Sequence, residues 1–274
     1  LLRRRRRQLK RVPMRLTTRR RLTRGALYVL FVALVVAVAL ATDWGRLAAA
    51  FFQVDIARDL LPEIITVALK NTLLFTVISF VGGLVLGIVL ALMKLSSVPP
   101  YRWFATAYVE LFRGLPALLT IFAMAFMVPI ALGVRLPGGS VGAGLVGLVL
   151  VAGAYMAEVI RSGIQAVPKG QSEASRSLGM SPAKTMGWIV LPQGFRIIIP
   201  PLTNEFVLLL KDTSLLFIAG STVLTKELTT FARDASSMWS NGTPLVMAAM
   251  LYLLVTIPLT RLVAVLERRL GRGR

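Results

Sequence analysis

The sequence contains no cysteine and no histidine among its 274 residues. Disulfide bonds, thiol nucleophiles, metal sites built from Cys or His, and histidine general bases are therefore excluded. No glycine is followed by lysine, so the chain also lacks a phosphate-binding Walker loop. We expect no cofactor, no metal ion and no catalytic residue in this chain, and any ATP that drives its function would be hydrolysed by a partner.

Charged residues are also scarce. They make up 16% of the chain, against 56% hydrophobic residues, which is too apolar for an ordinary soluble domain. About 20 consecutive apolar residues are enough to cross a bilayer as a helix. The apolar runs predict an all-α membrane protein with about six transmembrane helices, at residues 26–41, 64–93, 103–132, 141–160, 201–220 and 244–266.

The net charge of +20 has a topological pattern. Twelve of the 32 Lys and Arg residues lie within residues 1–25, and others follow at 94–102, 161–200 and 261–274. These basic segments alternate along the chain with segments that hold acidic residues and few basic ones. The positive-inside rule then places both termini and the stretch 161–200 in the cytoplasm. We expect contact with membrane lipid and no nucleic-acid partner, with nucleic-acid binding by residues 1–25 as the lesser alternative.

The N-terminal region has two interpretations. Residues 1–25 form a basic cytoplasmic segment, and residues 26–42 form an N-terminal transmembrane helix that we expect to be retained as a signal anchor. The alternative is a cleaved signal peptide, with Ala39-Leu40-Ala41 as the small-residue cleavage site. Because the chain opens with Leu1, Met14 is a candidate start, and residues 1–13 need not all be native.

The stretch 161–200 is polar between two apolar runs. Its segment 172–178 favours a short helix, which Gly179 would end by adopting a left-handed backbone. Ser181 and Pro182 would begin a second short helix, and Leu191-Pro192 would break it before the next span starts at Pro200-Pro201. Two short helices at a glycine corner would form a rigid knob on the membrane face, suited to a groove on a partner.

The fifth predicted span carries charges that are costly inside a membrane and generally face protein or water. Glu205 and Asp212 are seven residues apart, so they share a helix face about 10 Å apart along the axis. Asn204 and Lys211 form a parallel seam. Two carboxylates facing a cavity would attract an ammonium group, while Lys211 could pair with a substrate carboxylate or with Asp212. The alternative is a buried ion-pair network that holds helices together.

Other small and charged residues have packing explanations. The sequence 142–147 fits G-x-G-x-x-G by spacing, but no strand precedes it and no ribose-binding acid follows, so we reject a dinucleotide site. Its glycines, like Gly83 and Gly87, are expected to allow close helix packing. Glu158 and Arg161 are three residues apart and are expected to form an ion pair.

Several motifs match a known family in type and spacing. Glu173-Ala174-Ser175, then Gly179, then Ile189-x-Leu191-Pro192 resemble the EAA loop of bacterial ABC-importer permeases. Ser175 stands where that motif usually has Ala. Segments 112–116, 157–171, 191–193, 200–206 and 209–215 are similar to the polar amino-acid permeases of the histidine, glutamine and arginine type.

The resemblance covers about residues 60–270 and implies a five-helix permease core after one additional N-terminal helix, with a cytoplasmic coupling loop at about 161–200. It implies an importer of polar amino acids in the bacterial cytoplasmic membrane. The expected partners are an ABC ATPase dimer, a second permease subunit of the same or another sequence, and an extracytoplasmic solute-binding protein. The residues implied in ATPase coupling are Glu173, Ala174, Ser175, Gly179, Ile189, Leu191 and Pro192. The resemblance also favours substrate contact by Glu205, Asp212, Asn204 and Lys211.

Other functions stay open at this point. The chain could be a stand-alone channel or secondary transporter, an ABC permease for a solute other than an amino acid, or a membrane scaffold without transport. The knob argues against a stand-alone protein, because it would then have no partner. For Glu173 the alternative to coupling is a helix-stabilising role in the first turn of its helix.

Overall fold

The computed structural model describes residues 16–134 and 136–271, and every regular element in these ranges is helical. The predicted all-α fold is therefore confirmed for the described residues. The chain divides into two compact units, Leu1–Ala50 and Phe51–Arg274. Met14 and most of the basic N-terminal segment lie outside the described residues.

The first unit is built on α1 (Leu16–Ala41), which contains the first predicted span. None of its apolar window Thr23–Ala41 is buried by protein. The helix continues through the candidate cleavage site at 39–41 and is followed by α2 (Trp44–Phe51). At the junction the indole Nε1 of Trp44 donates a hydrogen bond of 2.8 Å to the carbonyl of Ala39.

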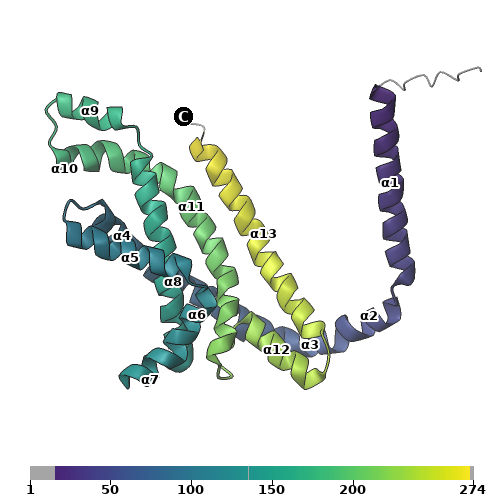
Figure 1. The fold of residues 1–274 in the computed structure, drawn as a ribbon. Coiled ribbons are helices and arrows are strands. Elements are labelled where there is room, and N and C mark those ends of the chain that lie inside the picture. The colour runs from purple at the N-terminus through teal and green to yellow at the C-terminus, as the bar shows by residue number, and fades with distance from the viewer. Residues whose placement is uncertain (1–15, 135, 272–274) are drawn as a thin grey trace, which may run out of the picture. The chain divides into compact units, whose positions relative to one another are not determined.

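The second unit begins with a long helical stretch (Figure 1). Its elements are α3 (Val54–Glu63), the π-helical η1 (Ile64–Leu69) and α4 (Lys70–Leu95). The next elements are α5 (Pro99–Gly114), α6 (Ala117–Phe122), the π-helical η2 (Ala123–Met127) and α7 (Val128–Leu132).

A single helix over residues 103–132 was predicted, and that prediction is wrong. The chain bends by 106° between Pro99–Gly114 and Ala117–Leu132. Leu115 at the break is extended, with φ −89° and ψ 141°. Pro116 explains the bend, because proline lacks the N–H that a helix interior needs and its ring disfavours helical backbone at the preceding residue.

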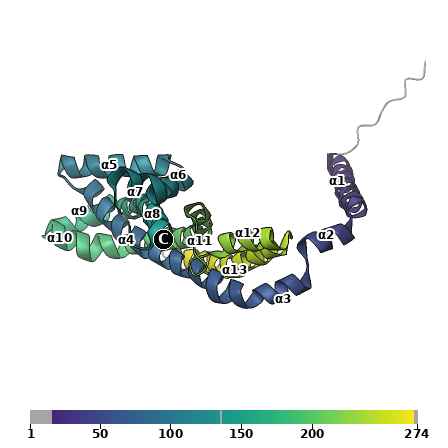
Figure 2. The same ribbon diagram turned by 90° about the horizontal axis from the view of Figure 1, so that it is seen from below.

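The rest of the chain starts with the long helix α8 (Gly139–Gln165). It is followed by α9 (Lys169–Ser177), α10 (Pro182–Thr185), the π-helical η3 (Met186–Val190), α11 (Leu191–Asp212), the 3₁₀-helical η4 (Thr213–Ala219), α12 (Leu228–Trp239) and α13 (Thr243–Gly271). Figure 2 shows α12 and α13 side by side, and residues of the two helices contact one another.

Four helices of the described chain are long and apolar enough to span a membrane, or five if the bent pair counts as one span. The predicted number of six is therefore not confirmed. The predicted span that is missing from this set is 201–220, which overlaps α11. This helix carries four charged residues along its length: Arg196, Glu205, Lys211 and Asp212.

The centre of the second unit is the packing of α4 along α8. A Cβ added to Gly83 would lie 2.7 Å from the Cβ of Ala152, and one added to Gly87 would lie 2.8 Å from the Cβ of Met156. These distances are too short for any side chain, so the predicted role of these glycines in close packing is confirmed.

A polar cluster fixes the end of this unit that lies opposite α9 and α10 in Figure 1. The side-chain amide of Asn71 on α4 donates hydrogen bonds to the carbonyls of Leu224 (2.8 Å) and Lys226 (3.0 Å). The hydroxyl of Thr72 accepts one from the backbone N–H of Leu228 (3.1 Å). The segment that leads into α12 is therefore tied to α4.

Glu227 extends this cluster to α13. Its carboxylate caps α12 by accepting hydrogen bonds from the N–H groups of Thr229 (2.6 Å) and Thr230 (2.7 Å), and it accepts a third from the Tyr252 hydroxyl (3.4 Å). Only 1% of Glu227 is exposed. Burial raises the pKa of this carboxyl, although the hydrogen bonds from Thr230 and Thr229 act in the opposite direction.

Candidate functional site: the knob and the polar face of α11

The knob, residues 169–190, turns at Gly179 as predicted. Helix α9 ends where Gly179 adopts φ +82°, in the left-handed region that favours glycine. The N–H of Met180 donates to the carbonyl of Ser175 (3.2 Å), which closes the helix end. Ser181 then caps α10 by accepting a hydrogen bond from the N–H of Lys184 (3.4 Å). The predicted glycine corner is confirmed.

The second arm of the knob differs from the prediction. Leu191 and Pro192 do not break the chain: η3 runs directly into α11, and Pro200 and Pro201 lie inside that helix. A proline is tolerated inside a continuous helix where a local π-helical turn adjusts the backbone pairing, and η3 lies directly before Pro192. The predicted break at Leu191-Pro192 is wrong, and the second arm of the knob is continuous with α11.

A buried hydrogen bond joins the two arms across the corner. Ser175 on α9 and Thr185 on α10 are 5% and 4% exposed, and their hydroxyl oxygens lie 3.0 Å apart. The Ser175 hydroxyl also donates to the carbonyl of Ser172 (3.0 Å). The Ser175 hydroxyl is the donor to Thr185 Oγ1, so its single proton is shared between Thr185 and the Ser172 carbonyl. Sequence reasoning treated Ser175 only as a small residue, since nothing in the pattern pointed to Thr185.

We expect Ser175→Ala to lower the stability of the knob by about 1–2 kcal/mol, because the buried Thr185 hydroxyl loses its partner. Adding Thr185→Val should recover part of the loss by removing the unpaired hydroxyl. Thermal unfolding and limited proteolysis at 169–190 measure the effect. Ser177→Ala is the control, because Ser177 is exposed and its hydroxyl donates only to the Glu173 carbonyl of its own helix. Equal stability of the two single variants would contradict the role of the pair.

The outer face of the knob carries Glu173, whose side chain is exposed. Glu173 and Ala174 are exposed, and Leu178 beside the corner is 85% exposed. No described residue forms an ion pair with Glu173. Since α9 begins at Lys169, Glu173 lies beyond the first turn. The alternative that Glu173 stabilises the first turn of its helix is therefore wrong.

Two polar links hold the knob end of the unit together. The side-chain amide of Gln193 on α11 donates to the carbonyl of Ile189 (2.9 Å) and to Gln171 Oε1 on α9 (3.4 Å). Nearby, Glu158 on α8 pairs with Lys94 on α4 (3.0 Å) and with Arg161. The predicted Glu158–Arg161 pair is confirmed, whereas Lys94 was not foreseen because it lies 64 residues earlier in the chain.

The polar residues of α11 fall on two faces. Glu205 and Asp212 are half-buried, and Asn204 and Lys211 are exposed. Asp212 is the last residue of α11. Among the described residues, no salt bridge involves Glu205, Lys211 or Asp212, so the alternative ion-pair network is not formed within this part of the chain.

The acidic residues do not assemble into a metal site. Within residues 16–134 and 136–271 there is no group of three or more His, Cys, Asp or Glu residues that could hold an ion. The site therefore consists of an exposed knob joined to a helix with an unpaired polar face.

The chain belongs to the family of inner-membrane components of binding-protein-dependent transport systems, whose model matches residues 83–272. It is a multi-pass membrane protein and a transport component rather than an enzyme. It is 40% identical over 203 residues to the probable glutamine ABC transporter permease protein GlnM of Bacillus subtilis (strain 168), with 74% of this chain and 91% of the relative covered. It is 36% identical over 221 residues to the L-cystine transport system permease protein TcyB of the same organism, with 80% and 91% covered.

A solved structure agrees in fold. The crystal structure of an amino acid ABC transporter with histidines contains a chain that is 34% identical to this one, with a TM-score of 0.70. The match covers 77% of this chain and 95% of that one. The resemblance to ABC-importer permeases predicted from the motifs is thus confirmed at the level of the family.

Proposed function

We propose that this chain is the permease subunit of an ATP-driven importer that carries polar amino acids. The observation that carries the proposal is the knob, because its exposed Glu173 face is accessible to a partner and its second arm is continuous with α11. The relatives support the substrate class, since their names refer to glutamine and L-cystine, and the solved transporter is an amino acid transporter.

The coupling mechanism follows from the rigidity of the knob. Closure of an ATPase dimer would displace the surface formed by Glu173, Ala174 and the corner at Gly179. Ser175 and Thr185 hold the two arms together, so the knob would move as a body. Ile189, Leu191 and Pro192 lie where this movement passes into α11, which carries the polar face. ATP binding on the partner would thus alter access to Glu205 and Asp212.

The assembly would contain a second permease subunit, an ATPase dimer and an extracytoplasmic solute-binding protein. The basic segments favour a topology with both termini and the knob in the cytoplasm. The domain limits of the proposal are a basic segment 1–25, an N-terminal helix 26–42 and a permease domain 60–270. The chain itself would need no cofactor.

The partner requirement is the decisive test of this function. Pull-down of the tagged full chain from its native membrane should recover an ABC ATPase, and reconstituted uptake should require both ATP and the solute-binding protein. Removal of residues 172–179 should abolish uptake. Uptake without an ATPase would instead establish a stand-alone channel or secondary transporter, and specific uptake of another solute would overturn the amino-acid assignment.

The substrate site is tested by Glu205→Gln and Asp212→Asn. If the carboxylates bind an ammonium group, each variant should raise the substrate KM at least tenfold, because a charge-assisted hydrogen bond contributes about 1.5–3 kcal/mol. Both substitutions preserve side-chain shape, so unfolding temperatures should stay close to that of the wild type. Asn204→Ala and Lys211→Gln test the parallel seam in the same uptake assay. Unchanged KM in both acidic variants would exclude this site.

A further inference from the structure

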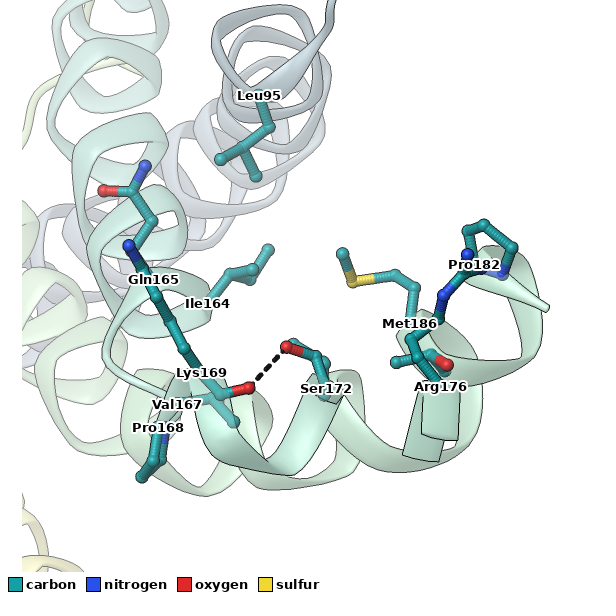
Figure 3. A pocket seen from close by; sticks show the side chains of 12 residues that line it. Leu95, Ile164, Gln165, Val167, Pro168, Lys169, Ser172, Arg176, Pro182 and Met186 are labelled. Carbon is teal, nitrogen blue, oxygen red and sulfur yellow. Dashed lines mark hydrogen bonds between the residues drawn. The ribbon is translucent and has the colours of Figure 1, made fainter. Parts of the chain in front are cut away.

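A hollow of about 700 Å³ separates the knob from the ends of two spans (Figure 3). Its walls include Leu95, the last residue of α4, and Ile164 and Gln165 at the end of α8. The remaining lining comes from residues 167–190, on the knob and just before it. The volume is in the range of sites that hold small molecules. Glu173 and Gly179 do not line the hollow, so the proposed coupling surface does not account for it.

The lining combines apolar side chains with two cations. Leu95, Ile164, Val167, Met186 and Val190 supply apolar surface. Lys169 and Arg176 supply positive charge, and Figure 3 shows them on either side of Ser172. Of the described residues, none that lines the hollow is acidic, and none forms an ion pair with either cation.

The spacing along α9 explains why both charges line the hollow. Lys169, Ser172 and Arg176 recur at i, i+3 and i+7, which places them on one helix face. That face is directed to the hollow, whereas Glu173 and Ser177 fall on a neighbouring exposed face. The short helix therefore presents two different surfaces, one to a protein partner and one to the space beneath the knob.

The position of the hollow indicates which anion it can hold. The helices that contain the candidate spans of α4 and α8 end at Leu95 and Gln165, and both residues line it. Spans end where lipid head groups begin. Basic pockets between transmembrane helices at this level bind the head groups of anionic lipids. We infer that the hollow binds the head group and glycerol region of an anionic phospholipid, with its phosphate between Lys169 and Arg176 and its apolar part against Leu95 and Ile164.

Such a lipid would contact the knob and both spans at once. A ligand stabilises the conformation to which it binds best. The lipid would therefore stabilise the knob in the position seen here, which leaves the hollow open. Head-group charge would then regulate the coupling of ATP hydrolysis to uptake. This second part rests on the proposed function, whereas lipid binding itself does not.

Binding can be measured on the full chain without any transport assay. Native mass spectrometry after reconstitution in nanodiscs of phosphatidylglycerol and phosphatidylcholine should show retained phosphatidylglycerol. The double variant Lys169→Gln/Arg176→Gln should lower its apparent affinity on the order of tenfold, since each basic residue near an anionic membrane surface contributes appreciably to binding. Lys184→Gln is the matched control, because Lys184 is an exposed cation of the same knob that does not line the hollow. Equal retention by the double variant and the control would overturn the inference.

Further measurements distinguish a lipid in the hollow from a simple anion and from a protein partner. Soluble glycerol 3-phosphate added to phosphatidylcholine discs should not saturate the site at millimolar concentration, and saturation there would show a simple anion site instead. Loss of ATPase binding by the double variant with unchanged lipid retention would show that the hollow faces the protein partner. With the assembled importer, phosphatidylglycerol should stimulate uptake by the wild type and by Lys184→Gln several times more than uptake by the double variant.

Discussion

Glu173→Ala should reduce ATP-driven uptake by at least tenfold and leave the fold intact. Glu173 is exposed and has no ion-pair partner among the described residues, so its removal leaves no internal group unpaired. In the assembled importer its carboxylate would be buried against the ATPase. Truncating one member of a buried, hydrogen-bonded charge pair costs 2–5 kcal/mol or more, which corresponds to well over tenfold in binding.

The measurements are ATPase association by pull-down and uptake in proteoliposomes that contain the binding protein. Glu267→Ala is the matched control, since Glu267 is an exposed glutamate on α13, outside the knob. Glu173→Gln separates charge from shape: it should retain part of the activity if the carboxylate accepts hydrogen bonds, and almost none if it pairs with a cation. Wild-type uptake by both Glu173 variants would remove this residue from the coupling surface.

The second large effect is expected in the packing of α4 against α8. Gly87→Val should lower the free energy of unfolding by about 3 kcal/mol, the upper part of the range for overpacking. A Cβ at this position would lie 2.8 Å from the Cβ of Met156 and 3.1 Å from the backbone nitrogen of Ala157. The neighbouring helix therefore cannot yield by a rotamer change alone.

Thermal unfolding of the purified chain in detergent measures this loss. Gly114→Val is the control, because a Cβ on Gly114 would meet no atom within 4 Å, and its effect should stay within about 0.5 kcal/mol. A fall in unfolding temperature that is the same for both variants would indicate a general intolerance of valine rather than close packing of α4 on α8.

Local features of the fold could be predicted where the chemistry is local. The left-handed Gly179, the cap at Ser181 and the small-residue packing at Gly83 all follow from properties of one residue and its neighbours. The bend at Pro116 also has a local cause, the proline itself. It was not predicted because the largely apolar run 103–132 continues through it. Hydrophobicity measures the tendency to enter a membrane, and it carries no information on the direction of the backbone.

Features that depend on distant residues could not be read from the sequence. The Ser175–Thr185 pair spans ten residues, the Lys94–Glu158 pair spans 64, and Asn71 reaches carbonyls more than 150 residues away. The junction of η3 with α11 was predicted as a break because Pro192 usually interrupts a helix. The π-helical η3 directly before Pro192 accommodates the proline without a break, and its formation depends on the packing of the whole knob.

The two ends of the second unit differ in mechanical freedom. Hydrogen bonds that Asn71 donates and that Thr72 and Glu227 accept cross-link α4, α12 and α13 at one end, and the knob projects at the other. Because α11 packs against α4 and α13, a displacement of the knob would turn α11 about this cross-linked end. Residues near Pro192 would travel furthest and Asp212 least. The substrate pathway of the proposed importer would then open and close at its knob end, while the carboxylates of α11 stay in place. One set of polar groups would serve both the inward-open and the outward-open state.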